Sequence, residues 1–452
     1  MSNYKEYIPQ YCSDILRLLS QAGYEAYVVG GAVRDLLLGK IPHDFDLATS
    51  ATPNQVIEVC DKAGLRHVAE NGLKHGTVTV ISHDECVEIT TFRTESGYSD
   101  NRRPDSVEFT TDIKQDVMRR DYTMNALYLD YEGNICDEVG GIDDIKAGII
   151  RSVGDPYRRY EEDALRILRG LRFSAQLGFK LDTKTADACR ECAQLLNNIS
   201  AERIFTEFTG LICGEYASDV IRENFEVITT IIPELGPMRG FDQCSRYHDR
   251  DMLEHSLAVL DGISCKTGSR PVGLAYAALL HDIGKPSVFY KDSRGFGHMK
   301  RHPQAGARIV LDIADRLKFP SALRQYVHRM VLLHDTYTKP DKKYVHRFMM
   351  RFPDIVGDEL FELQRADIMG HSVYGRGRLD VLDAEVKYYA ELRRERAPIV
   401  VGDLEVSGED LINAGFKPGP EFSTMLRRAL RAVVEGQIPN KNESIMKFLR
   451  KM

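Results

Sequence analysis

The sequence YVVGGAVRDLLLGKIPHDFDLAT, residues 27–49, decides the fold of the first part of the chain. Its opening apolar run predicts a strand, the Gly30-Gly31 pair predicts a turn, and the residues that follow predict a helix. The two glycines allow backbone N–H groups to approach a phosphate, and a helix N-terminus adds a favourable dipole. The Gly-Lys-Ser/Thr ending of a Walker loop is missing, so the stretch is not a P-loop.

Two aspartates, Asp44 and Asp46, lie near the end of this stretch. Residues two apart on a strand point to the same face, so we expect their carboxylates to lie together while Phe45 packs into the core. Such carboxylates repel each other unless a cation joins them, and Mg²⁺ prefers oxygen ligands. Glu88, on a predicted neighbouring strand, could add a third ligand. Two ions held in this way activate an attacking hydroxyl and stabilise a leaving pyrophosphate. A surface Asp-x-Asp turn is the alternative interpretation.

The pattern Gly-Gly-x-x-Arg-Asp at residues 30–35, followed by Asp-x-Asp, resembles the nucleotidyltransferase head of bacterial CCA-adding enzymes and poly(A) polymerases. A second segment, RRDYTMNA at residues 119–126, resembles the second motif of this family. The resemblance implies a nucleotide site that includes Gly31, Arg34 and Arg120. Both arginines are expected to meet the triphosphate.

A third segment, EDALRILRGLRF at residues 162–173, concerns the choice of nucleotide. Its apolar spacing predicts a helix over residues 162–177, on which Asp163 and Arg166 are three apart and share a face. A carboxylate acceptor beside a guanidinium donor can imitate a Watson–Crick edge. Cytosine and adenine present an amine beside a ring-nitrogen acceptor, whereas guanine and uracil present a carbonyl beside a ring N–H. The pair should therefore accept CTP and ATP and reject GTP and UTP.

Arg166, Arg169 and Arg172 form a stripe at helical spacing, for which a solvated helix face is the ordinary interpretation. The family resemblance instead implies that all three contact the nucleotide. The same resemblance implies that residues 100–104 form a loop that switches conformation between the first two motifs.

Six histidines and aspartates in the second half of the chain lie on apolar helical stretches, where a lone polar group is costly to bury. Convergence on a metal ion would satisfy them, and a purely structural helix bundle is the alternative. In their order they resemble the HD phosphohydrolase superfamily. The resemblance implies phosphoester hydrolysis assisted by Ni, Co, Mn or Fe. The implied core ligands are His255, His281, Asp282 and Asp367, and a second ion would use His302 and His334.

The bulk composition is that of an ordinary globular protein: 452 residues, 43% hydrophobic and 28% charged, with a net charge of −7. This charge argues against nonspecific coating of nucleic acid but allows a local basic surface. No apolar run approaches the ~18 residues of a membrane span, and the start of the chain has no apolar signal core, so we expect no membrane association and a cytoplasmic protein. Nine cysteines are expected to be reduced thiols rather than disulfides.

Strand signals are confined to the first 150 residues and helical spacing dominates afterwards, which predicts an α+β fold: an α/β head with a small mixed sheet, then all-α domains. The expected strands are 26–29, 78–81, 87–91 and 126–130. The expected domains are a nucleotidyltransferase head (1–154), a helical neck and body for nucleotide selection and RNA binding (155–240), an HD-type domain (241–374) and a tRNA-binding tail (375–452).

The resemblance covers nearly the whole chain and is closest to HD-containing bacterial CCA tRNA nucleotidyltransferases. It implies addition of C, C and A to the 3′ end of tRNA from CTP and ATP. A poly(A) polymerase, a CC-adding or A-adding enzyme, and an HD phosphohydrolase with a nucleotide-binding head are the alternatives. The intact Asp44 and Asp46 count against the HD phosphohydrolase, and a pure RNA-binding module is the remaining alternative. The oligomeric state is not predicted.

Overall fold

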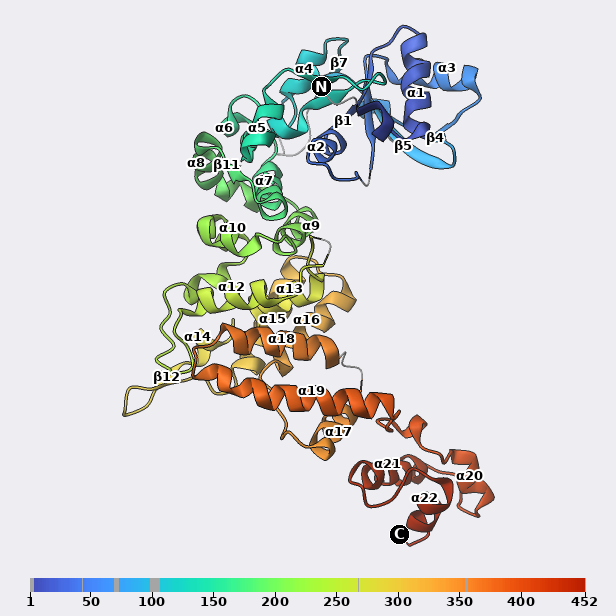
Figure 1. Ribbon diagram of the computed structural model, residues 1–452, viewed down its shortest axis with the longest axis vertical. Coiled ribbons are helices and arrows are strands. Elements are labelled where there is room, and N and C mark those ends of the chain that lie inside the picture. The colour runs from blue at the N-terminus through green and yellow to red at the C-terminus, as the bar shows by residue number, and fades with distance from the viewer. Residues whose placement is uncertain are drawn as a thin grey trace. The chain divides into compact units, whose positions relative to one another are not determined.

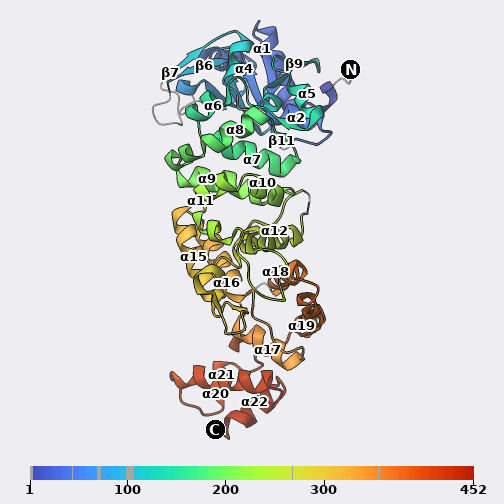
Figure 2. The same ribbon diagram turned by 90° about the vertical axis from the view of Figure 1, so that its left-hand side faces the viewer.

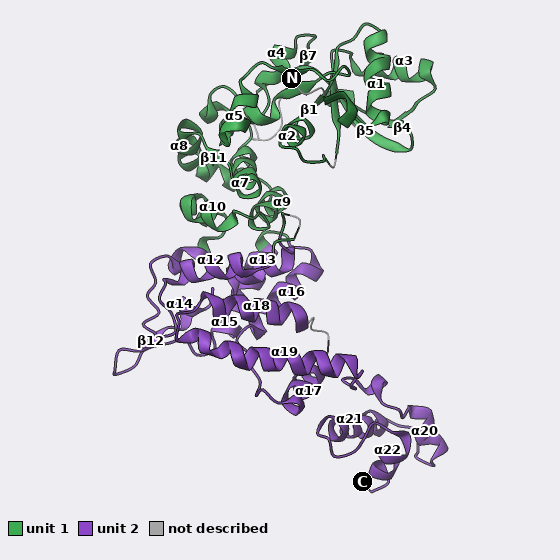
Figure 3. Ribbon diagram, viewed as in Figure 1, with its two compact units in different colours: residues 1–233, 265–269, 316–318 green, residues 234–264, 270–315, 319–452 purple. Residues whose placement is uncertain are grey.

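The computed structural model describes residues 4–42, 44–68, 73–97, 106–266, 268–353 and 357–451 (Figure 1). Residues 100–104, the expected switching loop, lie outside this part. The chain divides into two compact units (Figure 3). Unit 1 comprises Met1–Pro233, Cys265–Ser269 and Arg316–Lys318, and unit 2 comprises Glu234–Ser264, Arg270–Asp315 and Phe319–Met452.

Unit 1 begins with a seven-stranded mixed sheet in the order β3-β4-β5-β2-β1-β8-β9. Only β2 and β5 are parallel neighbours, and the other adjacent pairs are antiparallel. The four predicted strands are present to within two residues. The strands are β1 (Ala26–Val29), β2 (Asp46–Thr49), β3 (Arg66–Val68), β4 (Thr77–Ser82), β5 (Glu85–Thr91), β8 (Leu127–Leu129) and β9 (Ile135–Asp137).

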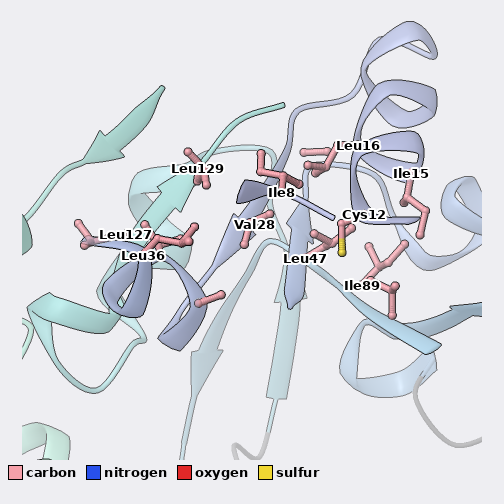
Figure 4. Packing of buried hydrophobic residues seen from close by; sticks show 14 of the residues in the cluster. Ile8, Cys12, Ile15, Leu16, Val28, Leu36, Leu47, Ile89, Leu127 and Leu129 are labelled. Carbon is pink, nitrogen blue, oxygen red and sulfur yellow. The ribbon is translucent and has the colours of Figure 1, made fainter. Parts of the chain in front are cut away.

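Helices α1 and α2 cover the sheet with apolar side chains (Figure 4). Leu16 of α1 and Leu36 of α2 pack with Val28, Leu47 and Ile89 of the strands, and all five side chains are buried. The remaining head elements are α1 (Gln10–Gln21), α2 (Gly31–Leu37), α3 (Pro53–Ala63), α4 (Ile113–Met118), α5 (Gly141–Ala147), β6 (Arg93–Ser96), β7 (Ser106–Phe109) and β10 (Ile149–Ile150).

The rest of unit 1 is almost wholly helical, as expected. The predicted helix over residues 162–177 is wrong in one detail, because the chain breaks at Asp163. This residue adopts extended backbone angles, and its Oδ1 accepts a hydrogen bond from the Leu165 N–H at 3.1 Å, which favours a new helix start. The elements are α6 (Pro156–Glu162), α7 (Leu165–Leu177), β11 (Lys180–Leu181), α8 (Thr183–Glu191), α9 (Ala201–Ile212), α10 (Ala217–Glu223) and α11 (Phe225–Ile231).

Unit 2 contains a helical group in which α12 and α18 are close neighbours (Figures 1 and 2). The last three helices, α20 to α22, pack around a small apolar core of their own that includes Leu411, Leu430 and Ile445. The elements are α12 (Met252–Gly262), α13 (Val272–Leu280), α14 (Lys285–Val288), β12 (Tyr290–Lys291), β13 (Gly297–His298), α15 (His302–Arg316), α16 (Ser321–Leu333), α17 (Lys342–Arg351), α18 (Gly357–Gly370), α19 (Leu379–Arg394), α20 (Gly408–Asn413), α21 (Glu421–Val434) and α22 (Asn442–Leu449).

The predicted α+β class, with a mixed-sheet head followed by helices, is confirmed. All nine cysteines are free thiols, as expected. Among the described residues, no helix combines the length and the apolar character needed to cross a membrane.

Candidate active site in the head and a histidine–aspartate centre

The turn after β1 holds Arg34 against the sheet. Gly30 has φ 74° and ψ −135°, a conformation that residues with side chains rarely adopt, and α2 starts at the next residue. Arg34, on α2, is 9% exposed, and its Nη1 donates to Asn125 Oδ1 at 2.8 Å. Its Nη2 lies 2.8 Å from Asp35 Oδ1. These contacts fix the guanidinium beside the turn.

Asp44 does not lie on the strand that carries Asp46, so the expectation of two aspartates on one strand is wrong. β2 starts at Asp46, which pairs with Val29, the last residue of β1. The residues after Val29 form the turn and α2, so no antiparallel partner remains for Asp44. Phe45 packs against the head core as predicted. Because Leu47 pairs with Ile89 in parallel register, Asp46 and Glu88 each directly precede the paired segments of neighbouring strands.

The carboxylates influence one another electrostatically. Desolvation raises the pKa of Asp46, and the charges of Glu88 and Asp44 raise it further, while Arg120 opposes this. All three carboxylate residues are exposed. An aspartate whose charge is disfavoured by two nearby acids fits a hard divalent cation, which would offset the repulsion. Their oxygens do not, however, belong to any group of described residues whose ligand atoms all lie within 4.8 Å of one another.

Arg120 is held by a buried acid that the sequence analysis missed. Its Nε donates to Tyr128 Oη at 2.7 Å, and its Nη2 lies 3.3 Å from Asp116 Oδ2. Asp116 is fully buried and also pairs with Arg119 at 2.8 Å. A signal was available, because Asp116 precedes the two arginines by three and four residues. A Cβ on Gly30 would lie 3.9 Å from Arg120 Nη1, so this arginine borders the glycine turn.

The predicted arginine stripe is not a solvated face. Arg169 donates twice to Asp121 Oδ2, at 2.9 and 2.7 Å, and Arg172 Nε lies 2.9 Å from Glu207 Oε2. The guanidinium carbons of Arg34, Arg169 and Arg172 lie 5.1, 5.6 and 4.7 Å from the centroid of the Phe173 ring. Three cations from two helices therefore gather around one aromatic ring, which suits a polyanionic ligand.

Asp163 and Arg166 have separate partners. Asp163 Oδ2 accepts from Arg203 Nη2 at 2.9 Å. Arg166 is 8% exposed, and its guanidinium donates to the Arg119 carbonyl at 2.9 Å and to Glu162 Oε2 at 3.1 Å. Arg203 was not anticipated, because it lies outside the predicted helix. Glu162 was missed although its i,i+4 spacing to Arg166 within that helix was a signal.

In unit 2, the six predicted HD residues come together, and all six are at most 9% exposed. Asp367 Oδ1 lies 3.0 Å from His255 Nε2, and Asp282 Oδ2 lies 3.2 Å from His281 Nε2. The other oxygen, Asp282 Oδ1, lies 3.4 Å from His302 Nε2 and 3.6 Å from His334 Nε2. One carboxylate therefore joins two groups of possible ligands: His255, His281 and Asp367 on one side, and His302 and His334 on the other.

Backbone carbonyls orient the histidines of this centre. Nδ1 of His281, His302 and His334 lies 2.8, 3.0 and 2.7 Å from a carbonyl oxygen three residues earlier. A carbonyl only accepts, so each Nδ1 carries a proton and each Nε2 is the nitrogen that faces the centre, an arrangement typical of metal-binding histidines. Burial alone would raise the pKa of Asp282, but His281 and Lys285 hold it well below its usual value. The donor set of nitrogen and oxygen fits a divalent transition metal.

A mixed-sheet head with clustered acids and arginines, joined in one chain to a buried histidine–aspartate centre, defines a nucleotidyltransferase with an HD domain. Family models agree: the Poly A polymerase head domain matches residues 26–151, and the HD domain matches residues 252–346. Two further models, whose descriptions concern RNA binding by polymerase A and tRNA nucleotidyltransferases, match residues 178–236 and 395–449.

Full-length relatives narrow the class. The chain is 34% identical to the CCA-adding enzyme of Lactobacillus delbrueckii subsp. bulgaricus over 440 residues, 96% of each protein. It is 33% identical to that of Streptococcus gordonii, covering 99% of this chain and 98% of the relative. The chain belongs to the CCA-adding enzyme family of tRNA nucleotidyltransferases. This confirms the family predicted from the sequence, and the names of these relatives do not favour the poly(A) polymerase alternative.

Solved structures agree in fold. The Bacillus stearothermophilus CCA-adding enzyme in complex with CTP has a TM-score of 0.69 at 28% identity, covering 98% of this chain and 96% of that one. The Thermotoga maritima CCA-adding enzyme complexed with tRNA has a TM-score of 0.61 at 18% identity, covering 99% and 97%, and supports the fold alone.

Proposed function

We propose that the protein adds C, C and A to the 3′ end of tRNA at the site formed by Asp44, Asp46 and Glu88. Its place in the CCA-adding enzyme family over the full chain supports this function most strongly. The 3′ hydroxyl of the RNA attacks the α-phosphorus of CTP or ATP and loses its proton, while the bond to pyrophosphate breaks. Mg²⁺, held by Asp44 and Asp46, would lower the charge that builds up on the oxygens.

The arginines bind the triphosphate in this proposal. Arg120 lies beside the glycine turn and close enough to Asp46 to lower its pKa. Arg34, Arg169 and Arg172 gather around Phe173. Each arginine has an acidic or amide partner that orients it before the nucleotide arrives, so less side-chain entropy is lost on binding.

One incubation tests the proposal against its rivals. The protein is mixed with tRNA that lacks its 3′ CCA, with Mg²⁺ and with each labelled nucleotide, separately and together. Incorporation of two C and one A supports CCA addition. A long A tail would indicate a poly(A) polymerase, and addition that stops after CC, or that needs a preformed CC end, would indicate a partial enzyme.

Nucleotide choice by Asp163 and Arg166 is a further part of the proposal. The Asp163 carboxylate is paired with Arg203 at 2.9 Å, and its oxygens keep further lone pairs that can accept a hydrogen bond from the amine of cytosine or adenine. Arg166 is already fixed by Glu162 and by the Arg119 carbonyl. We infer that the base binds to the carboxylate that Arg203 orients.

Asp163→Ala is expected to raise kcat/KM for UTP and GTP relative to CTP and ATP by about 10- to 100-fold, because the loss of one buried hydrogen-bond partner costs about 1–3 kcal/mol. Arg203→Ala is the matched control, since it breaks the same ion pair and leaves the base-binding carboxylate in place. Equal loss of selectivity in both variants would assign the effect to the ion pair and contradict base recognition by Asp163.

The domain division belongs to the proposal as well: head at 1–154, neck and body at 155–240, HD domain at 241–374 and tail at 375–452. The four family-model matches each fall within one of these ranges. The tail would contact tRNA. A cytoplasmic location remains a prediction from the sequence.

A second activity, hydrolysis of phosphoesters, is proposed for the histidine–aspartate centre. The supporting observation is the Asp282 carboxylate, whose two oxygens face histidines on both sides. Two ions of Ni, Co, Mn or Fe would fit there and would activate water. Water attacks the phosphorus, the ester bond breaks, and the leaving oxygen takes a proton. A cavity of about 1100 Å³, lined by Asp282, His302, His334 and Asp367, gives access to the centre.

His281→Ala is expected to abolish hydrolysis of 2′,3′-cyclic nucleotides measured with Ni²⁺, Co²⁺ or Mn²⁺, while CCA addition with Mg²⁺ continues. The imidazole lies 3.2 Å from Asp282 Oδ2, and its removal takes one ligand away from one of the two ions. His328→Ala, on α16 and outside the three ligand groups, is the control. Hydrolysis that persists in His281→Ala would contradict the assignment.

A further inference from the structure

Two more histidines, His248 and His371, adjoin the centre just described. The ring centroids of His248 and His371 are 4.5 Å apart, and each ring lies against His255, at 4.9 and 5.2 Å. The three imidazoles offer nitrogens that all lie within 4.8 Å of one another. Neither His248 nor His371 is among the six residues assigned to the HD centre. They are called the outer histidines below.

The chain around the outer histidines is held firmly. Ser372 N–H donates to the Tyr247 carbonyl at 2.8 Å, and Ser372 Oγ donates to the Arg246 carbonyl at 2.7 Å. These two bonds join the residues next to His248 and His371. A Cβ on Gly375 would lie 2.6 Å from His371 Cβ and 3.0 Å from the Tyr247 carbonyl, so the close approach requires a glycine there. The pair is therefore part of a built arrangement.

Among the residues that the structure describes, one buried nitrogen of each outer histidine has no hydrogen-bond partner. His371 is 5% exposed, and its Nε2 lies 3.4 Å from Asp367 Oδ1, where it can donate. The proton on Nε2 leaves the lone pair on Nδ1. Within the described part of the chain, this buried Nδ1 and the buried Nδ1 of His248 have no hydrogen-bond partner. A carboxylate that orients a histidine in this way is typical of metal sites.

We propose that His248 and His371 form a third ion position beside the two joined by Asp282, which takes a divalent transition metal such as Co²⁺, Ni²⁺ or Zn²⁺. Imidazole nitrogen suits these ions and does not suit Mg²⁺ or Ca²⁺. His255 Nδ1 faces the Gly370 carbonyl at 3.3 Å, so its lone pair, on Nε2, serves the inner centre. The outer ion therefore has two protein ligands.

An ion with two protein ligands keeps open positions and exchanges readily. Both outer histidines line the cavity of about 1100 Å³ that reaches Asp282 and Asp367. Water or a substrate oxygen can complete the coordination from that side. The proposal concerns ion binding alone and does not require that the HD centre hydrolyse a phosphoester.

Equilibrium dialysis of the full chain against Co²⁺, followed by elemental analysis, tests the third position. The double variant His248→Ala with His371→Ala is expected to bind one Co²⁺ fewer per chain than the wild type. The difference between the two absorption spectra should contain a ligand-field band. The single variants His248→Gln and His371→Gln should each weaken the last Co²⁺ by at least about 10-fold. Ions bound in the head are the same in the wild type and in the variants, so they do not contribute to the differences in Co²⁺ stoichiometry and absorption.

Two results would overturn the proposal. Equal Co²⁺ stoichiometry and identical spectra in the wild type and the double variant would mean that the outer histidines bind no ion. The second is that the double variant loses all ions of the HD centre while its unfolding transition in the presence of chelator matches that of the wild type. The outer histidines would then support the inner centre instead of binding an ion. The glutamine variants keep side-chain size, so they decide the question if the double variant does not fold. His328→Ala serves as the control and should bind as many ions as the wild type.

Discussion

Asp44→Asn together with Asp46→Asn is expected to lower nucleotide incorporation by at least about 10³-fold, because a metal ion that stabilises the transition state contributes several kcal/mol and each 1.4 kcal/mol is tenfold in rate. Glu88 and Asp44 both raise the pKa of Asp46, which supports the proposal that the three acids act at one site. Asparagine keeps the side-chain shape and removes the charge. The measurement is single-turnover addition of the first C to tRNA that lacks CCA.

The control for this pair removes the same number of charges from exposed positions of the head. Asp84 and Asp143, with side chains 94% and 88% exposed, pair with the exposed Arg66 and Lys146. Asp84→Asn with Asp143→Asn should therefore keep the rate within a few-fold, since exposed ion pairs contribute about 0–1 kcal/mol. If the variant with both Asp44 and Asp46 replaced incorporated nucleotide at the wild-type rate, the catalytic role of these two residues would be contradicted. The fold would not be affected by this result.

The sequence was sufficient to predict an element or a site where one short pattern determines the structure. Apolar runs that end at glycines predicted β1 and the turn at Gly30, because both depend on neighbouring residues alone. The HD residues were also found, because each is a polar group on an otherwise apolar helix and costs free energy to bury without a partner.

Prediction failed where two local preferences compete. Helical spacing around residue 163 continues without interruption, but an aspartate can also accept a hydrogen bond from a backbone N–H two residues ahead and start a new helix. Asp44 is excluded from the strand because of another part of the chain. β1 ends at Val29, so the antiparallel strand β2 starts at Asp46, the partner of Val29.

Partners distant in sequence could not be predicted. Arg34 and Phe173 meet although 139 residues separate them, and spacing along the chain contains no information about that distance. The Arg203 partner of Asp163 and the Glu207 partner of Arg172 come from another helix, α9. The fold supplies these pairs, and they change the interpretation of the arginine stripe from a solvated surface to a set of oriented cations.

Asp116→Ala is expected to destabilise the head by about 3–5 kcal/mol, because removal of one partner from a buried ion pair leaves the opposite charge uncompensated. Asp116 is fully buried, and it contacts Arg119 at 2.8 Å, Arg120 at 3.3 Å and the Tyr128 hydroxyl at 2.5 Å. Arg120 loses its anchor beside the glycine turn, so the KM for CTP should rise as well. Asp112→Ala, which removes the N-cap of the same helix, is the control and should cost about 1 kcal/mol.

The pH dependence separates the charge of Asp116 from its packing. Burial would raise the pKa of this carboxyl, but Arg119, Arg120 and the Tyr128 hydroxyl hold it below the usual 3.8. A lowered pKa contributes stability that is fully present above about pH 4 and is lost as the pH falls through the folded-state value. Hydrogen exchange of head peptides, measured by mass spectrometry, gives the free energy of opening of the head. The difference in this free energy between wild type and Asp116→Ala, called the gap here, should therefore be constant above about pH 4 and shrink below it. A gap that stays constant at low pH would mean that Asp116 acts through packing rather than charge, and Arg120 would then owe its position to Tyr128 alone.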